Sequence, residues 1–399
     1  MAIRAGVGLS TLRDSYRAGY EAYNLAMQRM GSDKADFLFV FSSVAFDQQE
    51  VIRAVREASN NTPLTGCTDA GGITAEGPNQ KSVAVMAIQS DTIAFTNGIG
   101  GDIKTNARLA GQAFAKDIVS RSQSPLHTLI MLPDVLTGNG ADIVRGAIDA
   151  LGPHFPLVGG AAGDDFLFEK TYQYCNDQVL SGTVAGVGLS GSFTFGIGVR
   201  HGWLPIGIPM KVTKSHGAVV EELDNRPAIS IYQDYFGEKA EDLKKEPLAR
   251  MAITYPLGIK APELDEYLIR DPITVDDKGA ITCAAEIPEG SEIRLMIGSK
   301  EHAIEAAQEA ARKLMRDFEA AGSKPKLLLM FNCIAREKLF AQKAKDEIEA
   351  VMEIIGRDVP LLGFYTYGEV APIAGESRDA AKINTRFYNE TIVMCAIGE

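Results

Sequence analysis

The chain alternates between short apolar runs and longer stretches in which apolar residues recur every three or four positions. Three of the runs are rich in aromatic and branched side chains, a composition typical of buried strands. These runs span residues 36–43, 127–134 and 326–333. A stretch with helical spacing follows each run, at 48–58, 141–152 and 344–356. After each predicted helix come the sequence Pro-Leu-x-Gly and a turn that contains glycine, so the chain holds three weakly similar strand–helix–strand units.

The similarity among the three units extends in both directions along the chain. A further amphipathic helix is predicted before each unit, at 15–30, 106–119 and 302–318. Before each of these helices lies an extended segment, at 4–10, 93–100 and 292–299. A strand closes each unit, at 82–88, 182–190 and 391–398. Two strands linked through a helix normally pair in parallel, so we predict an α/β fold of mixed sheets flanked by helices.

An insertion of about 100 residues, near 193–291, separates the second unit from the third. Its alternating pattern predicts strands joined at His216-Gly217, and a helix is expected over 225–236 with Asn225 as its cap. Because 399 residues exceed the usual size of one hydrophobic core, we expect two domains. The first is 1–215, with units one and two, and the second is 216–399, with the rest of the insertion and unit three.

Net charge and cysteine content limit the partners and the cellular compartment that we expect for this protein. The formal net charge is −12 and the pI is about 5.1, which disfavours a nucleic-acid backbone or an anionic membrane surface as partner. The first residues lack the pattern of a secretory signal, and no apolar run is long enough to cross a bilayer. Five scattered cysteines without a CxxC pair indicate reduced thiols. We therefore expect a cytoplasmic protein.

Six segments, taken in order, resemble the signatures of the FIST family over nearly the whole chain. They span 66–73, 158–166, 201–213, 222–229, 332–337 and 363–372. The resemblance implies a FIST N-terminal domain followed by a FIST C-terminal domain. It also implies a sensory protein that binds a small metabolite such as an amino acid. Since no length remains for an output module, the signal is expected to pass to a separate partner such as a kinase or cyclase.

The glycine-containing turns follow the strands after each helix, where ligands bind in open α/β sheets. The candidate ligand-binding residues in and beside these turns are Gly66, Cys67, Thr68, Gly160, Asp164, Asp165, Asn332, Arg336, Tyr365, Tyr367, Gly368 and Glu369. The carboxylates could accept hydrogen bonds from an amine, and Arg336 could bind a carboxylate or phosphate. The alternative is that the glycines serve tight turns and the acids lie in solvent, that a tyrosine belongs to the core, and that Arg336 forms a surface ion pair with Glu337 or another acid.

Alignment of the three units on Pro-Leu-x-Gly places Gly72, Asp165 and Glu369 at equivalent positions. Members of the resembled family often carry an acidic residue there. The first turn is therefore predicted to have lost a polar ligand contact.

His201 lies in the sequence Arg-His-Gly-Trp and is a candidate axial ligand of haem, since some members of the resembled family are linked to haem and nitric-oxide sensing. A structural role for this histidine is the alternative. Covalent haem is not expected because the chain has no CxxCH motif, and no metal site is predicted.

Two other functions compete with the sensor hypothesis. Cys67 or Cys333 could be the nucleophile of an enzyme. The chain, however, has no GxSxG elbow, P-loop, HExxH motif or GxGxxG opening a helix, so we expect no enzymatic activity. The acidic surface and the insertion could instead serve a protein-interaction scaffold. A closed polar cavity would favour the sensor.

Overall fold

Three six-stranded sheets form the body of the protein in this computed structural model, which describes residues 3–245, 250–260 and 266–399. The first sheet runs in the order β1 (Arg4–Ser10), β6 (Val83–Gln89), β2 (Phe37–Ser43), β3 (Leu64–Asp69), β10 (Gln173–Cys175), β11 (Gln178–Leu180). The second is β7 (Ile93–Gly100), β12 (Val184–Gly191), β8 (Leu126–Pro133), β9 (Leu157–Gly160), β24 (Glu369–Pro372), β25 (Thr385–Tyr388). The third is β13 (Thr194–Arg200), β26 (Ile392–Gly398), β22 (Pro325–Cys333), β23 (Leu361–Thr366), β4 (Gly72–Thr74), β5 (Gly77–Asn79).

All three sheets repeat one pairing scheme. The two strands joined through a helix are parallel in each sheet, as in β2 with β3, and the remaining neighbours are antiparallel. The same holds for β8 with β9 and for β22 with β23. The predicted fold of mixed sheets flanked by helices is thus confirmed.

The last two strands of each sheet form a hairpin that comes from a different part of the chain. Hairpin β10–β11 follows β9 in sequence but joins the first sheet by pairing with β3. Hairpin β24–β25 follows β23 but joins the second sheet, and hairpin β4–β5 follows β3 but joins the third. The exchange is cyclic, so each sheet is completed by its neighbour.

Helices cover one face of each sheet. They are α1 (Ser15–Met30) and α2 (Gln48–Ala58) on the first, α3 (Ala107–Arg121) and α4 (Gly140–Leu151) on the second, α7 (Lys300–Ala321) and α9 (Ala344–Ile355) on the third. Most begin at a polar cap whose side chain accepts a backbone N–H of the first turn, as Asp14, Asp47, Asn106, Asn139 and Ser299 do. These bounds agree with the sequence prediction to within about three residues.

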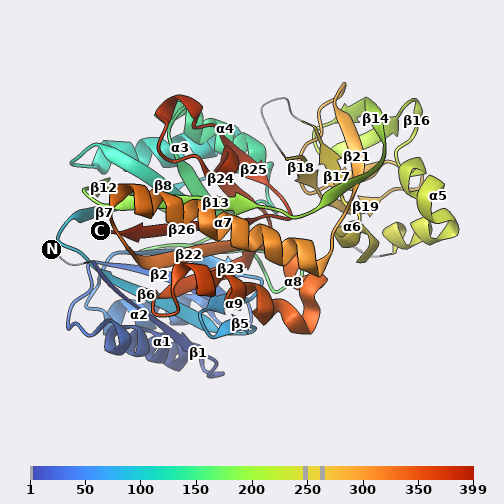
Figure 1. The fold of residues 1–399 in the computed structure, drawn as a ribbon. Coiled ribbons are helices and arrows are strands. Elements are labelled where there is room, and N and C mark those ends of the chain that lie inside the picture. The colour runs from blue at the N-terminus through green and yellow to red at the C-terminus, as the bar shows by residue number, and fades with distance from the viewer. Residues whose placement is uncertain (1–2, 246–249, 261–265) are drawn as a thin grey trace.

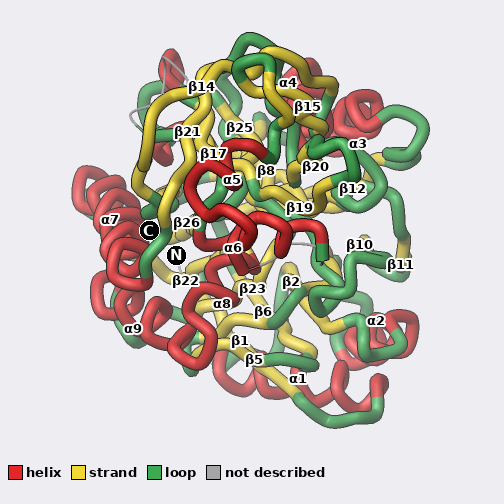
Figure 2. Tube along the Cα trace, turned by 90° about the vertical axis from the view of Figure 1, so that its right-hand side faces the viewer, coloured by secondary structure: helices red, strands yellow, loops and turns green. Residues whose placement is uncertain are grey.

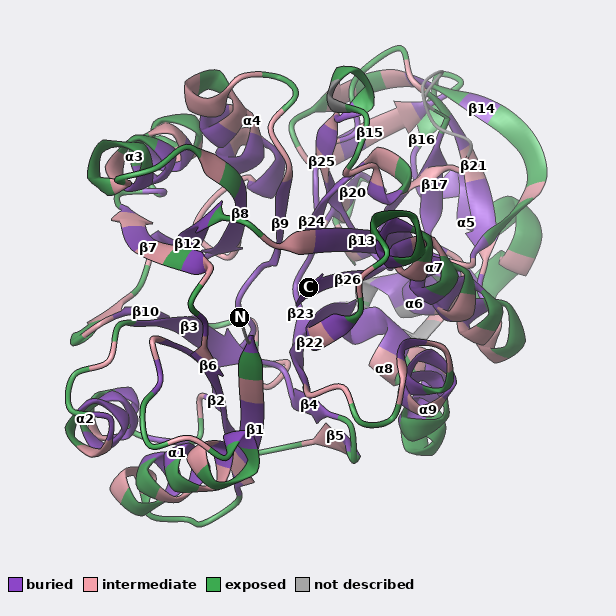
Figure 3. Ribbon diagram, turned by 60° about the vertical axis from the view of Figure 1, so that its left-hand side comes forward, coloured by how far each residue is buried: buried purple, intermediate pink, exposed green. Residues whose placement is uncertain are grey.

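The opposite faces of the three sheets pack on one another and form a central core (Figure 3). Phe37 of the first sheet stacks on Phe95 of the second, with 4.8 Å between ring centroids. Phe41 of the first sheet meets Phe364 of the third at 4.5 Å. Strands that are buried on both faces read as continuous apolar runs rather than as alternation, which is the pattern at 37–41 and 327–331.

The insertion forms a lobe on one side of the three sheets (Figure 1), and Figure 2 looks onto it. Its strands include β14 (Leu204–His216), β15 (Val219–Leu223), β17 (Leu257–Ile259), β18 (Leu268–Arg270), β19 (Pro272–Val275), β20 (Ile281–Cys283) and β21 (Glu292–Ile297). The hairpin at His216-Gly217 is confirmed. The helix with an Asn225 cap is wrong, because Arg226–Pro227 is a short strand on β15 and α5 spans Ser230–Phe236.

The opening strand of the third unit also differs from the prediction. Residues 292–297 form β21, which pairs with β14 and β17 inside the lobe. In the first sheet, the opening strand β1 pairs with the closing strand β6. In the third sheet, the closing strand β26 pairs instead with β13, which precedes the lobe in sequence. Both β13 and β21 are extended apolar segments, and their long-range partners alone distinguish them. No helix among the described residues is both long and apolar enough to cross a membrane.

Because Phe41 and Phe364 join two sheets, replacing both with leucine should show energetic coupling. We expect a coupling of about 0.5–1.5 kcal/mol in a double-mutant cycle measured by urea unfolding. The matched control combines Phe41→Leu with Phe114→Leu on α3, which belongs to a different core, and these two should add within about 0.5 kcal/mol. Strict additivity for Phe41 and Phe364 would contradict the shared core.

Candidate functional site

A cavity of about 360 Å³ lies where the second unit, the lobe and the third unit meet. Its walls are mainly apolar: Val135 and Leu136 follow β8, Ile273 is on β19 and Ile334 begins α8 (Ile334–Phe340). The other lining residues are Phe168, Asp271, Thr282, Cys283, Ala284, Cys333, Tyr367 and Asn389. A mostly apolar cavity with a few placed polar groups is the usual form of a small-ligand site.

Asp271 is the carboxyl group that lines this cavity, and the buried Glu390 neighbours Asp271 without lining the cavity itself. Asp271, between β18 and β19, is 2% exposed, and its Oδ1 has no hydrogen-bond partner among the described residues. Burial raises the pKa of Asp271 to about 6. Burial and the charge of Asp271 together raise the pKa of Glu390 well above its ordinary value. We conclude that the pair shares one proton and carries a single negative charge near neutral pH.

The backbone around Glu390 is held in an unusual conformation. Glu390 has φ of 62°, a left-handed value that is costly for a residue with a side chain. The protonated carboxyl group of the pair can donate only to the other carboxylate, so Glu390 and Asp271 bond to each other, while Oδ1 of the preceding Asn389 meets no hydrogen-bond partner among the described residues. Buried polar groups are normally paired. The left-handed backbone at Glu390 and the unpaired oxygen of Asn389, which lines the cavity, mark this segment as a place where a ligand could supply the missing donor.

Glu369 is a third buried acid beside the pair. Its carboxyl group accepts hydrogen bonds from the Thr366 hydroxyl and from the Thr391 N–H and hydroxyl, the last at 2.6 Å. Burial, with a smaller contribution from the charge of Asp271, raises the pKa of Glu369 to about 8. Glu369 is therefore neutral near pH 7, and it does not line the cavity itself.

Asp164 and Tyr367 build one wall of the cavity. The Tyr367 hydroxyl donates to Asp164, which also accepts the N–H groups of Phe168, Glu169 and Lys170 at 2.9, 2.6 and 2.9 Å. These bonds fold the loop so that Phe168 stacks on the Tyr367 ring, 4.7 Å between centroids. Tyr367 lines the cavity, and Asp164 holds the loop that forms the wall.

Arg336 lies outside the cavity, in a buried network of hydrogen bonds around Arg336 and Glu347 that we call the clamp. Its guanidinium pairs with Glu347 of α9, and neither side chain has any exposure. Its remaining N–H groups donate to the carbonyls of His201, Glu390 and Ala303. Asn332 donates to the same Glu347 at 2.7 Å. All five N–H donors of Arg336 are thus used within the protein, and the clamp fixes the backbone of Glu390.

The candidates in and near the glycine-containing turn of the first unit form a separate buried group. Gly66, Cys67 and Thr68 lie in β3, with Thr68 accepting the Tyr172 N–H at 2.9 Å. Asp165 accepts from Ser43 at 2.6 Å, and burial raises its pKa. Burial also raises the pKa of the Cys67 thiol well above its ordinary value. None of these residues lines the cavity.

Three other candidates are packed tightly against neighbouring strands. A Cβ at Gly160 would lie 2.5 Å from the Thr366 methyl, and one at Gly368 would lie 2.2 Å from the Phe387 ring. Gly368 also has φ of 143°, which favours glycine. Tyr365 is 1% exposed, and its ring packs on Gly71. Gly160 thus lets strands of the second and third units approach, and Gly368 leaves room for the Phe387 ring of its own unit.

The strand pairing corrects the alignment of the three turns. Glu369 pairs with Gly160, Gln173 with Cys67 and Gly72 with Phe364, so Gln173 rather than Asp165 is the counterpart of Glu369 and Gly72. The second unit has a longer loop before its hairpin, and Asp165 lies in that loop. An alignment on Pro-Leu-x-Gly cannot detect this difference in loop length.

The arrangement around His201 does not fit a haem ligand. The ring is 5% exposed, Nδ1 accepts the Trp203 N–H at 2.9 Å, and Nε2 lies 3.9 Å from Glu266. Burial, aided by the charges of Arg336 and Arg200, lowers the pKa of His201 to about 3. Nδ1 is already used within the protein, and although Nε2 meets no hydrogen-bond partner among the described residues, the ring is covered by protein and is not among the residues that line the cavity.

Sequence reasoning missed Asp271, Cys283, Asn389 and Glu390. One signal was present: Glu390 precedes an apolar strand, and Asp271 precedes a proline between two strands. Charged residues in such apolar surroundings are candidates for burial, but their partners come from distant parts of the chain.

Two family models and several relatives match this chain. The FIST N domain matches residues 36–226, and the FIST C domain matches residues 228–372. The uncharacterized protein MT0656 of Mycobacterium tuberculosis is 25% identical over 384 residues, or 94% of this chain and 96% of that protein. The uncharacterized protein MJ1623 of Methanocaldococcus jannaschii is 27% identical over 234 residues, or 56% of this chain and 43% of that protein. A chorismatase crystal structure aligns over both full chains at 9% identity and TM-score 0.37, a likeness too weak to carry an argument.

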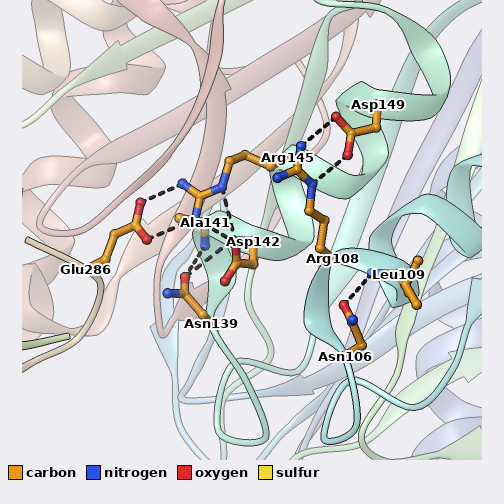
Figure 4. A network of polar contacts seen from close by, with 9 residues as sticks. All are labelled: Asn106, Arg108, Leu109, Asn139, Ala141, Asp142, Arg145, Asp149 and Glu286. Atoms are coloured by element: carbon orange, nitrogen blue, oxygen red, sulfur yellow. Dashed lines mark hydrogen bonds and ion pairs between the residues drawn. The ribbon is translucent and has the colours of Figure 1, made fainter. Parts of the chain in front are cut away.

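Replacing Arg336 with methionine should destabilise the protein by about 3–5 kcal/mol, because Glu347 would be left buried without its partner. Urea unfolding monitored by circular dichroism measures the loss. The control is Arg108→Met, which breaks the exposed pair with Asp149 (Figure 4) and should change stability far less. Equal losses in the two variants would contradict the clamp.

The raised pKa of Glu369 predicts a pH-dependent effect of Glu369→Gln. The folded state keeps this carboxyl protonated up to about pH 8, whereas the unfolded chain loses the proton near 4.5. The wild-type protein therefore loses this share of its stability as pH rises from 4.5 to 8, by at most about 1.4 kcal/mol per pH unit. Glu369→Gln should gain stability relative to wild type as pH rises from 5 to 8. The exposed Glu305→Gln should show no such trend, and a flat difference for Glu369→Gln would refute the assignment.

Proposed function

This chain belongs to the FIST family, and on that premise we propose that it is a sensory protein that binds a small ligand in the cavity beside Asp271 and Glu390. The observation that carries the proposal is a buried carboxylate, Asp271, that lines a mostly apolar cavity, together with Oδ1 atoms of Asp271 and Asn389 that meet no hydrogen-bond partner among the described residues. A buried charge without a partner is costly, and a ligand that donates hydrogen bonds would offset that cost.

The cavity favours a ligand with a cationic or N–H-bearing end and an apolar body. The single negative charge of the Asp271–Glu390 pair suits a protonated amine, while Phe168, Ile273 and Ile334 suit a hydrocarbon portion. A volume of about 360 Å³ accommodates a molecule of the size of an amino acid or a related amine. The FIST family resemblance led to the same ligand class.

The position of the cavity supports a signalling role. Its walls come from the second unit, the lobe and the third unit, so a ligand that fits one arrangement better would bias their relative positions. The shift can be no larger than the difference in ligand affinity between the two arrangements. We propose that a separate protein, such as a kinase or cyclase, responds to this change.

The protonation of the two cysteine thiols that line the cavity supports binding rather than catalysis. Cys283 and Cys333 both line the cavity, and burial raises the pKa of Cys283 to about 12 and that of Cys333 well above its ordinary value. A protonated thiol is a poor nucleophile.

A thermal-shift screen of amino acids and small amines at pH 7 should yield at least one stabilising ligand. Asp271→Asn should weaken its binding at least tenfold, because the charge that faces the amine is removed; Glu390→Gln keeps the shape and should have a smaller effect. The control is Asp91→Asn, at an exposed position outside the cavity.

Ligand binding should also slow alkylation of Cys283 and Cys333 relative to Cys395, which lies in a core strand. Equal affinity in Asp271→Asn and Asp91→Asn, or unchanged alkylation in the presence of a bound ligand, would overturn the site.

A further inference from the structure

A second cavity, of about 270 Å³, lies between α4, β25 and the lobe. One side is formed by the network in Figure 4, in which Arg145 of α4 binds Glu286 of the lobe at 2.5 and 2.9 Å and also binds Asp142. These contacts join the second unit to the lobe. They also neutralise Arg145, so this arginine adds little free charge to the cavity.

Arg270 is the unusual residue of this second cavity. It lines the cavity and is 3% exposed. Its Nε donates to the Glu286 carbonyl at 3.0 Å, and Nη1 donates to the carbonyls of Ile269 and Phe387 at 2.9 and 3.3 Å. Among the described residues, Nη2 meets no acceptor and no carboxylate lies within ion-pair distance. A guanidinium buried without an ion-pair partner is costly even where carboxylates lie further away, so the geometry favours binding of an anion.

The rest of the lining agrees with an organic anion. Lys260 is exposed and lines the cavity, and Arg386 lines it from β25. Ile259, Leu268 and Phe387 add apolar surface. The planar edge of a guanidinium suits the two oxygens of a carboxylate or phosphate.

We propose that this second cavity binds the carboxylate or phosphate group of a small organic molecule, with Arg270 as the buried counter-charge and Lys260 as an outer contact. The site is distinct from the cavity at Asp271. Its existence does not depend on the sensory function, because the charge, lining and contacts all belong to the second cavity.

The test uses the full chain with defined probes: sodium phosphate, acetate, succinate and glutarate, each compared with sodium chloride at equal ionic strength. At least one oxyanion should raise the melting temperature in a saturable way that chloride does not reproduce. Isothermal titration should give a Kd that rises about three- to tenfold in Lys260→Gln. The control Lys278→Gln, an exposed lysine of the lobe outside the cavity, should leave the Kd unchanged.

Two further variants locate the site. Arg270→Lys should abolish saturable binding, since it loses the two-pronged contact. If that variant fails to fold, Ser291→Trp serves instead, because its ring would fill the cavity from a half-buried lining position without removing a charge. The proposal is overturned if no probe exceeds chloride, or if binding survives in both Lys260→Gln and Ser291→Trp. Neither result would bear on amine binding, which is measured with Asp271→Asn.

Discussion

The exchange of hairpins among the three sheets is the constraint on which the rest of this protein depends. Hairpin β10–β11 completes the first sheet, β24–β25 the second and β4–β5 the third, so no unit can form its full sheet alone. Each exchange also places the second parallel strand of one unit (β3, β9 or β23) against the hairpin of another unit (β10, β24 or β4). The tightly packed Gly160 is needed at the contact of β9 with β24, and the Asp271 cavity lies beside this junction.

Buried charge then determines what the junctions can do. Arg336 and Glu347 satisfy each other and hold the backbone at Glu390. The carboxyl groups of Asp271, Glu390 and Glu369 are buried without an ion pair among the described residues, and burial is the largest cause of their raised pKa values. Paired buried charge stabilises an arrangement, whereas unpaired buried charge makes it responsive to a ligand.

A single stretch of chain separates the two cavities. Arg270 lines the cationic cavity and its neighbour Asp271 lines the acidic one, because successive residues of an extended segment point to opposite sides. The segment at 387–389 also runs between the two cavities: Phe387 of β25 lines the cationic cavity, and Asn389, just beyond the end of β25, lines the acidic one. The charge of Arg270 also lowers the pKa of Asp271. The two cavities are therefore electrostatically connected through this wall.

Local structure and the family could be read from the chain itself. The helices at 15–30 and 48–58, the strands at 37–43 and 327–333, the mixed α/β class and the FIST signatures depend on hydrophobic period, caps and short motifs, all of which act within a few residues. The tertiary structure alone decided that β13 opens the third unit, that Gln173 is the counterpart of Glu369, that Arg336 is a clamp, and that Asp271 meets Glu390. Each of these depends on which distant strands pair and which side chains lose contact with water. Pairing partner and burial are properties of the packed molecule, and a residue's near neighbours in sequence do not specify them.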